Sequence, residues 1–146
     1  MRSVLTVGVL ATLAMASPAY AGDLTVKVTG VKAKGGSLIV AVYDKATLFR
    51  AQPPFFGVAK VAGAGDSTVT IKNVPPGDYV VSVLHDANGD EKMTMGPDGR
   101  FGEGTALTNA EQLRGTPTFE ANKITIPATG ASVAIAMSYP EDRSGW

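Results

Sequence analysis

The residues best suited to chemistry lie between His85 and Asp90. Asp86, Asn88 and Asp90 place oxygen-bearing side chains at alternate positions, which is the 1, 3, 5 spacing of calcium-binding loops. That spacing suits a hard cation because a tightly curled loop turns alternate side chains towards one centre. The continuation departs from the calcium pattern, since Glu91 occupies the sixth position, where the sharp turn needs glycine.

The second half of the loop also lacks the expected chelating residue. Pro97 stands at the twelfth position, where calcium loops carry a glutamate, so Asp98 or Glu103 would have to complete the coordination shell. Two interpretations therefore stay open: a metal site with calcium as the cofactor, or a solvated turn rich in Asp and Asn that needs no metal. The predicted metal ligands are Asp86, Asn88, Asp90 and Glu103.

His85 is the only histidine of the chain and directly precedes this cluster. A lone histidine at a strand end typically orients a loop, because one ring nitrogen donates a hydrogen bond while the other accepts one. A transition-metal site would need further histidine or cysteine ligands, which the chain does not contain. A serine hydrolase is disfavoured as well, since Ser82 lies on the opposite face of the same expected strand. We predict no catalytic residues and no enzymatic activity.

Strands are expected to position these residues. Tyr79, Val81, Val83 and His85 share one face of an expected strand, residues 78–85, under the two-residue period. Prolines 75 and 76 must precede it because they cannot donate to a sheet ladder. We expect this strand to form a hairpin with residues 67–74, and we expect residues 37–43, which are apolar on both faces, to be central. Further strands are expected at residues 24–29, 124–126 and 133–139.

This pattern predicts an all-β fold, an antiparallel β-sandwich of about seven strands of the transthyretin-like or immunoglobulin-like type. Residues 86–122 are the exception, because these 37 residues show little periodicity and exceed the ~15 residues of ordinary loops. Apolar side chains at positions 101, 107, 113 and 119 predict that this segment is one long, ordered loop insertion.

The first residues predict the compartment. Arg2, the apolar run 4–16 and the Ala-Tyr-Ala sequence that ends at Ala21 have the features of a signal peptide. We expect residues 1–21 to be removed by cleavage after Ala21, which leaves 22–146 as a single domain in the periplasm or outside the cell. Thirteen basic and thirteen acidic residues, with no basic stripe, argue against a nucleic-acid partner. No later apolar run is long enough for a membrane span.

Several motifs then occur in a characteristic order: NVPPGDY at 73–79, LHDANGD at 84–90, Glu103-Gly104, Leu107-Thr108-Asn109, and GTPTFEA at 115–121. Together they resemble a family of small exported bacterial proteins catalogued as domain of unknown function 2141. The first of them is also similar to a turn and strand of transthyretin-like and carboxypeptidase-regulatory-like sandwiches. The resemblance implies the fold and the compartment, whereas the family has no agreed activity. Thr94 replaces an acidic residue of the family's pattern.

The leading functional expectation is a non-enzymatic binding or structural module of the bacterial envelope. A long loop on a rigid scaffold typically carries function, so residues 86–122 are expected to bind an unknown envelope component, a peptide or a glycan. One alternative is the calcium-binding protein described above. Another is an envelope glycan hydrolase with Asp86 and Glu103 as its acid–base pair. The predicted ligand-binding residues are His85, Asp86, Asn88, Glu103 and Asn109.

Overall fold

The computed structural model describes residues 21–50, 52–92, 102–112 and 115–142. Residues 1–20 of the predicted signal peptide lie outside this range, as do Pro97, Asp98 and the apolar residues 101 and 113 of the loop insertion. The strands are β1 (Gly22–Val31), β2 (Ser37–Tyr43), β3 (Phe55–Lys60), β4 (Gly65–Val74), β5 (Gly77–Asp86), β6 (Gly104–Leu107), β7 (Ile124–Ile126) and β8 (Ala131–Ala136). One short helix, α1 (Phe119–Asn122), and two 3-10 turns, η1 (Ala110–Gln112) and η2 (Pro140–Asp142), accompany them.

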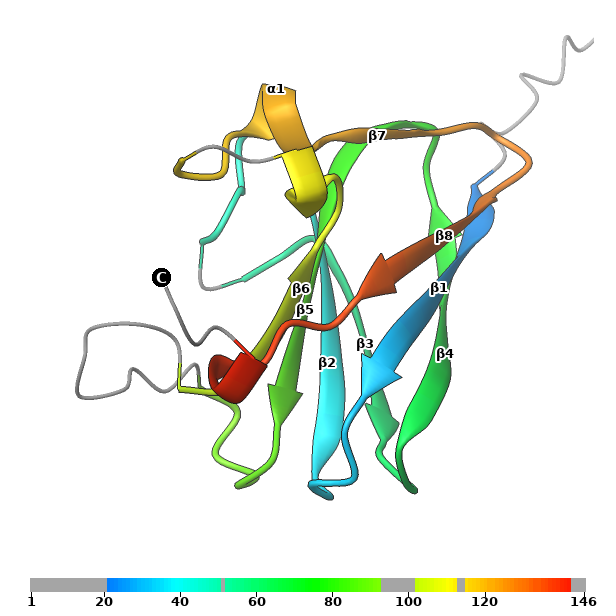
Figure 1. Ribbon diagram of the computed structural model, residues 1–146. Coiled ribbons are helices and arrows are strands. Elements are labelled where there is room, and N and C mark those ends of the chain that lie inside the picture. The colour runs from blue at the N-terminus through cyan, green and yellow to red at the C-terminus, as the bar shows by residue number, and fades with distance from the viewer. Residues whose placement is uncertain (1–20, 51, 93–101, 113–114, 143–146) are drawn as a thin grey trace, which may run out of the picture.

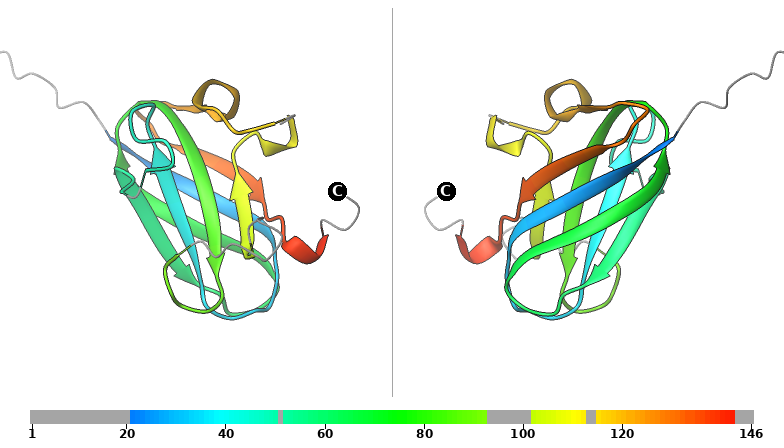
Figure 2. Two further views of the ribbon diagram at one scale, coloured as in Figure 1. Left: turned by 90° about the vertical axis from the view of Figure 1, so that its left-hand side faces the viewer. Right: turned by 90° about the vertical axis from the view of Figure 1, so that its right-hand side faces the viewer.

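The strands form two sheets that face one another (Figures 1 and 2). One sheet has the order β4-β1-β8, and the other has the order β3-β2-β5-β6, with β7 paired to β5. The predicted all-β sandwich is therefore confirmed. The pairing is antiparallel except between β1 and β8, which run parallel. Parallel strands cannot be joined by a short hairpin and need a long connection. Before β8 reaches β1, the chain accordingly crosses the end of the sandwich through β7.

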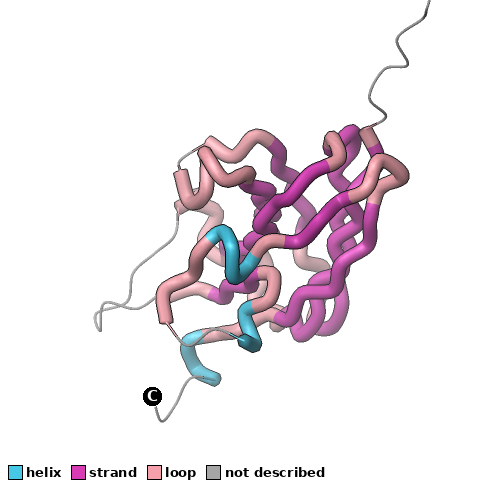
Figure 3. Tube along the Cα trace, turned by 90° about the horizontal axis from the view of Figure 1, so that it is seen from above, coloured by secondary structure: helices cyan, strands magenta, loops and turns pink. Residues whose placement is uncertain are grey.

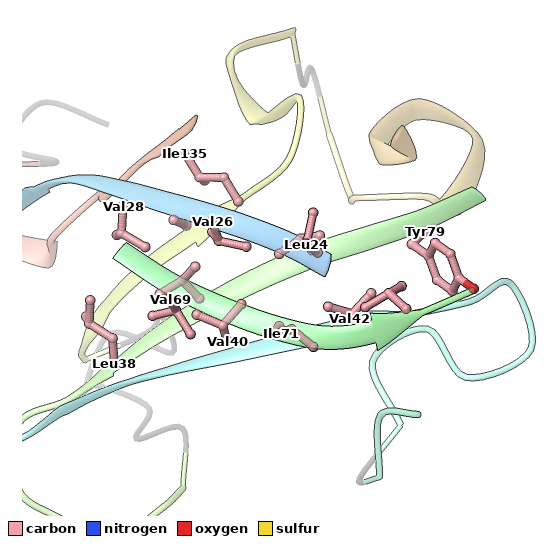
Figure 4. Packing of buried hydrophobic residues seen from close by; sticks show 14 of the residues in the cluster. Leu24, Val26, Val28, Leu38, Val40, Val42, Val69, Ile71, Tyr79 and Ile135 are labelled. Carbon is pink, nitrogen blue, oxygen red and sulfur yellow. The ribbon is translucent and has the colours of Figure 1, made fainter. Parts of the chain in front are cut away.

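The core lies between the two sheets and follows the two-residue period of the strands. Val26 of β1 and Val40 and Val42 of β2 are completely buried, and Val81 of β5 joins them. Figure 4 shows how side chains from both sheets meet in this layer. Each such side chain contributes roughly 1.5–3 kcal/mol to stability through burial. Both sheets are therefore firmly held, and the ends of β5 and β6 are fixed relative to one another.

One expected pairing is wrong. Strands β4 and β5 do not form a hairpin, because β4 pairs with β1 and β5 pairs with β2. The connection through Pro75 and Pro76 carries the chain from one sheet to the other. These prolines have no N–H groups to continue a ladder, and Asn73 turns the chain with a positive φ of 58°. Both strands themselves occupy the residues predicted for them.

The loop insertion is ordered where the structure describes it. It contains β6, which pairs with β5 from Ser82 to His85, followed by η1 and α1. In Figure 3, which views the molecule along its long direction from the end with α1, the helical turns and many of the loops lie to one side of the strands. No helix within the described ranges is long and apolar enough to cross a membrane.

Candidate functional site

The pairing of β5 with β6 brings the predicted acidic residues together. His85 lies opposite Gly104 in the antiparallel register, so Asp86 at the end of β5 and Glu103 just before β6 become neighbours. Side-chain oxygens of Asp86, Asp90 and Glu103 all lie within 4.8 Å of one another. Asp86 is 2% exposed and Glu103 is 9% exposed. We call these three residues the acidic cluster, and they are three of the four predicted metal ligands.

Asp86 also shapes the loop that follows it. One of its oxygens, Oδ1, accepts hydrogen bonds from the amides of Gly89 (3.0 Å) and Asp90 (3.2 Å), and Oδ2 accepts one from Glu91 (3.0 Å). Asn88, the fourth predicted ligand, is exposed, and its amide group donates to Oδ2 of Asp90 over 3.2 Å. Asp86 therefore curls the chain so that Asp90 comes back towards β6.

The acidic cluster has the chemistry of a hard-cation site. Carboxylates this close repel one another, and burial strengthens the repulsion because it removes screening by water. A calcium-like ion prefers oxygen ligands of this type. The three amide hydrogen bonds to Asp86 also stabilise its negative charge. The position of Asp86 is therefore equally explained by its role in shaping the loop without a metal. Asp98, the other candidate for closing the shell, lies outside the described residues.

His85 is buried beside the cluster, with 1% of its surface exposed. Its Nε2 lies 2.8 Å from the carbonyl oxygen of Gly35, and its Nδ1 lies 2.7 Å from the hydroxyl of Tyr139. A carbonyl oxygen can only accept, so Nε2 carries the proton and the hydroxyl of Tyr139 donates to Nδ1. The same hydroxyl accepts the backbone N–H of Lys32 over 2.9 Å. Both ring nitrogens of His85 are therefore engaged inside the protein.

Charged side chains lie over the ring of Tyr139. The ammonium groups of Lys32 and Lys34 lie 5.0 and 5.3 Å from the centroid of its ring, within the range of cation–π contacts. Both lysines also pair with Glu141 of η2, at 3.2 Å and 2.6 Å. The Lys34 ammonium is the main reason why the pKa of Glu141 falls from 4.5 to about 2. These contacts hold η2 against the turn between β1 and β2.

Asn109, the remaining predicted ligand-binding residue, is not part of this group. It follows the other end of β6, and its side-chain amide donates to the carbonyl of Lys123 over 3.0 Å. Figure 1 shows that end beside α1, whereas β5 reaches Asp86 at the opposite end of the sandwich. The structure therefore brings together His85, Asp86 and Glu103, but not Asn109.

The structure also contains a pocket that the sequence did not predict. Its volume is about 750 Å³, and it lies over the outward-facing residues of β5 and β6. Among the residues that line it are Tyr43, Phe49, Ser82, Leu84, Leu107 and Pro117. We call it the outer-face pocket. One sequence signal could have found it: residues 37–43 are apolar on both faces, which requires a second covered surface besides the core.

Among the described residues that line the pocket, Tyr43 is the one whose pKa is clearly shifted by its surroundings. Burial raises the pKa of its hydroxyl above the ordinary value of 10.0, and a hydrogen bond with Ser82 opposes that change. Its ring meets the ring of Phe49 edge-on, with centroids 5.9 Å apart. Tyr43 is therefore a neutral hydroxyl group at physiological pH.

The model of a family of uncharacterized proteins conserved in bacteria, DUF2141, matches residues 26–134. The chain belongs to this family. The DUF2141 match begins inside β1 and ends inside β8, so it includes the acidic cluster and most residues of the outer-face pocket. No curated protein and no solved structure matches the chain.

Proposed function

We propose that this DUF2141 protein is an exported, non-enzymatic binding module of the bacterial envelope, and that the outer-face pocket is its binding site. The observation that carries the proposal is the pocket itself. Its volume of about 750 Å³ falls within the roughly 300–1,000 Å³ of small-molecule sites. Its floor is a firmly held sheet, and Thr105, Leu107 and Pro117 come from the loop insertion. Export rests on the signal peptide that the sequence predicts.

The contacts of the polar groups support binding over catalysis. None of the described residues that line the pocket is an acid, a histidine or a lysine, which are common groups of acid–base catalysis. Tyrosine can also take that role, but burial raises the pKa of the Tyr43 hydroxyl further above neutral pH. At the acidic cluster, the ring nitrogens of His85 and both oxygens of Asp86 are engaged by neighbouring groups. The glycan-hydrolase alternative would need carboxylates about 5 Å or more apart with access to water, and it gains no support from a buried, hydrogen-bonded Asp86.

An uncharged fluorescent probe tests the proposal. N-phenyl-1-naphthylamine brightens when it enters an apolar site, and we expect it to bind the exported protein. Ser82→Phe would place a ring in the pocket, so affinity for the probe should fall at least tenfold. The matched control is Ser132→Phe on β8, which puts the same ring on an exposed site outside the pocket and should leave the affinity unchanged. Absence of binding to the unaltered protein, or equal binding to both variants, would overturn the proposal.

A second candidate function is the binding of a divalent cation, calcium in particular, by the acidic cluster. The convergence of Asp86, Asp90 and Glu103 within 4.8 Å favours it, because these residues come from both ends of the same loop. A bound ion would then stabilise the native state by mass action and fix the loop insertion to the sandwich.

Thermal unfolding tests the cation site. Millimolar calcium should raise the Tm of the exported protein, and chelation should reverse the change. Asp90→Asn should reduce the shift, because it removes an exposed carboxylate and leaves the amide hydrogen bonds to Asp86 in place. Glu91→Gln, at the next position, should keep the full shift. A Tm that calcium does not change would eliminate this candidate.

A further inference from the structure

We infer that the outer-face pocket binds an uncharged hydrocarbon chain of the kind found in lipids. This inference rests on the proposed function and names the class of ligand. Its first support is the chemistry of the lining. The polar groups that line the pocket are the hydroxyls of Tyr43, Ser82, Thr105, Thr116 and Ser138, and the other lining side chains are apolar. A charged ligand group inside the pocket would lose water and find no opposite charge among the described residues that line it.

The second support is an apolar strip that continues the pocket across the sheet. In the register of the strands, Ser82 lies opposite both Leu107 and Ala41, and Ala41 lies opposite Phe56. Directly opposed residues share one face, so this row crosses four strands on the outer side of the sheet. At about 4.8 Å per strand spacing, the row is roughly 14 Å long. It has the small side chains of Ala41 and Ser82 in its middle.

The third support is the exposure of large apolar side chains on the same face. Among the described residues, the large hydrophobic side chains that are exposed are Phe49 (51%), Phe56 (66%) and Val58 (56%). Phe49 lines the pocket. Phe56 belongs to the row of residues just described, and Val58 lies opposite Ile39 in the neighbouring row. Gathered apolar surface of this kind marks a binding site. An elongated apolar ligand would cover both the pocket and the strip.

The type of surface separates a hydrocarbon from a peptide or a glycan. The row lies on the face of the sheet, where the backbone N–H and C=O groups of β2 and β5 already pair with neighbouring strands. A peptide laid across this face would bury its own amide groups without partners, which costs several kcal/mol. A glycan would meet the same problem with its hydroxyls. A hydrocarbon chain has no polar groups to satisfy.

Displacement of N-phenyl-1-naphthylamine tests the ligand class. Uncharged monoacylglycerols with chains of 8, 10 and 12 carbons should displace the probe, with affinity that rises up to about fourfold per added methylene. Glycerol, maltotriose and a capped Val-Ala-Val peptide should leave the probe bound. Phe56→Ser should reduce the gain between 8 and 12 carbons, whereas Lys60→Ser, on the same strand but outside the strip, should not.

The outcomes separate the inference from the proposed function. If the probe binds but no monoacylglycerol displaces it, the hydrocarbon inference is overturned while the binding module stands. Displacement by maltotriose or the peptide overturns it in favour of that ligand. If the probe does not bind at all, the proposed function itself fails. Sedimentation with phosphatidylcholine vesicles shows whether the chain is taken from a bilayer or from solution, and either result is compatible with the same pocket.

Discussion

His85 shows how one residue joins three segments that are distant in the sequence. Its ring accepts a hydrogen bond from Tyr139 near the end of the described chain and donates one to Gly35 in the turn between β1 and β2. Gly104, opposite it on β6, packs so closely against the ring of Tyr139 that an added Cβ would collide with it. The ring is buried, so it positions the strand end that carries Asp86.

We predict that His85→Phe lowers the free energy of unfolding by about 1–3 kcal/mol, because it leaves the Gly35 carbonyl and the Tyr139 hydroxyl without their buried partner. Urea denaturation measures the change. Tyr139→Phe removes the same hydroxyl, so the double variant should lose less than the sum of the two single losses. Additive losses would contradict a shared network.

At the scale of elements, α1 is fixed to β6 by a pair of buried polar side chains. Asn122 is fully buried; it donates to the carbonyl of Thr108 over 2.9 Å and accepts from the amide of Thr118 over 3.1 Å. The hydroxyl of Thr108 donates in turn to the carbonyl of Asn122 and accepts from the amide of Val81 on β5. The segment that bounds the outer-face pocket is therefore held to the central strand.

Asn122→Ala should lower the free energy of unfolding by about 1–3 kcal/mol, because it leaves the buried carbonyl of Thr108 without its partner and removes the acceptor of the Thr118 amide. We also expect weaker binding of N-phenyl-1-naphthylamine, since Pro117 of the pocket lies next to this junction. Denaturation and probe titration measure both effects. Glu120→Ala, on the exposed side of α1, is the control, and an equal loss of stability in both variants would contradict the assigned role.

The elements that could be predicted are those with a clear local pattern. Strand β2 has the predicted bounds, and β4 and β5 contain the predicted residues. Strand β3 was missed because Gly57 interrupts its pattern, although an added Cβ there would lie 2.9 Å from Val69 on the opposite sheet. Strand β6 has four residues and forms only because β5 offers an edge. Which strands pair within each sheet depends on the whole core, so no local sequence pattern predicts it.

The same distinction applies to the candidate sites. The spacing of Asp86 and Asp90 is local, so the sequence could indicate an acidic site, and the missing glutamate at the twelfth position pointed to Asp98 or Glu103 as the residue that completes it. Asn109 belongs to the motif Leu107-Thr108-Asn109 and was predicted as a ligand-binding residue, but the length of β6 places it near the other end of the sheet. The two apolar faces of β2 indicate a covered outer surface, but they do not indicate which residues line the outer-face pocket, because these residues, from Tyr43 to Ser138, meet only in the folded chain.

For the whole molecule, the ion pairs of the surface predict a sensitivity to acid. The pKa of Glu141 is about 2 in the folded protein, against an ordinary value of 4.5, so the folded state favours the ionised form. This contribution to stability is complete above about pH 4.5 and is lost as the pH falls towards 2. Lys72 likewise lowers the pKa of Asp23, and Lys123 lowers that of Glu120.

Glu141→Gln should therefore flatten the dependence of stability on pH between about 4.5 and 2. The difference from the unaltered protein should amount to no more than about 1 kcal/mol at pH 6, since the pair is on the surface and screened by solvent. Urea denaturation at pH 6, 4 and 2.5 measures it. Glu111→Gln is a matched exposed control. A variant whose stability falls as steeply as that of the unaltered protein would contradict the role of Glu141.

Strand β3 has a further consequence for the solubility of the protein. Within the described residues it pairs with β2 alone, so it is an edge strand of its sheet. Exposed edge strands can pair with strands from other copies and so begin aggregation. Lys60 at its end is a charge of the sort that discourages such growth. A ligand that covers Phe56 and Val58 would shield the same edge strand, so the protein with bound ligand should resist aggregation longer than the protein without it.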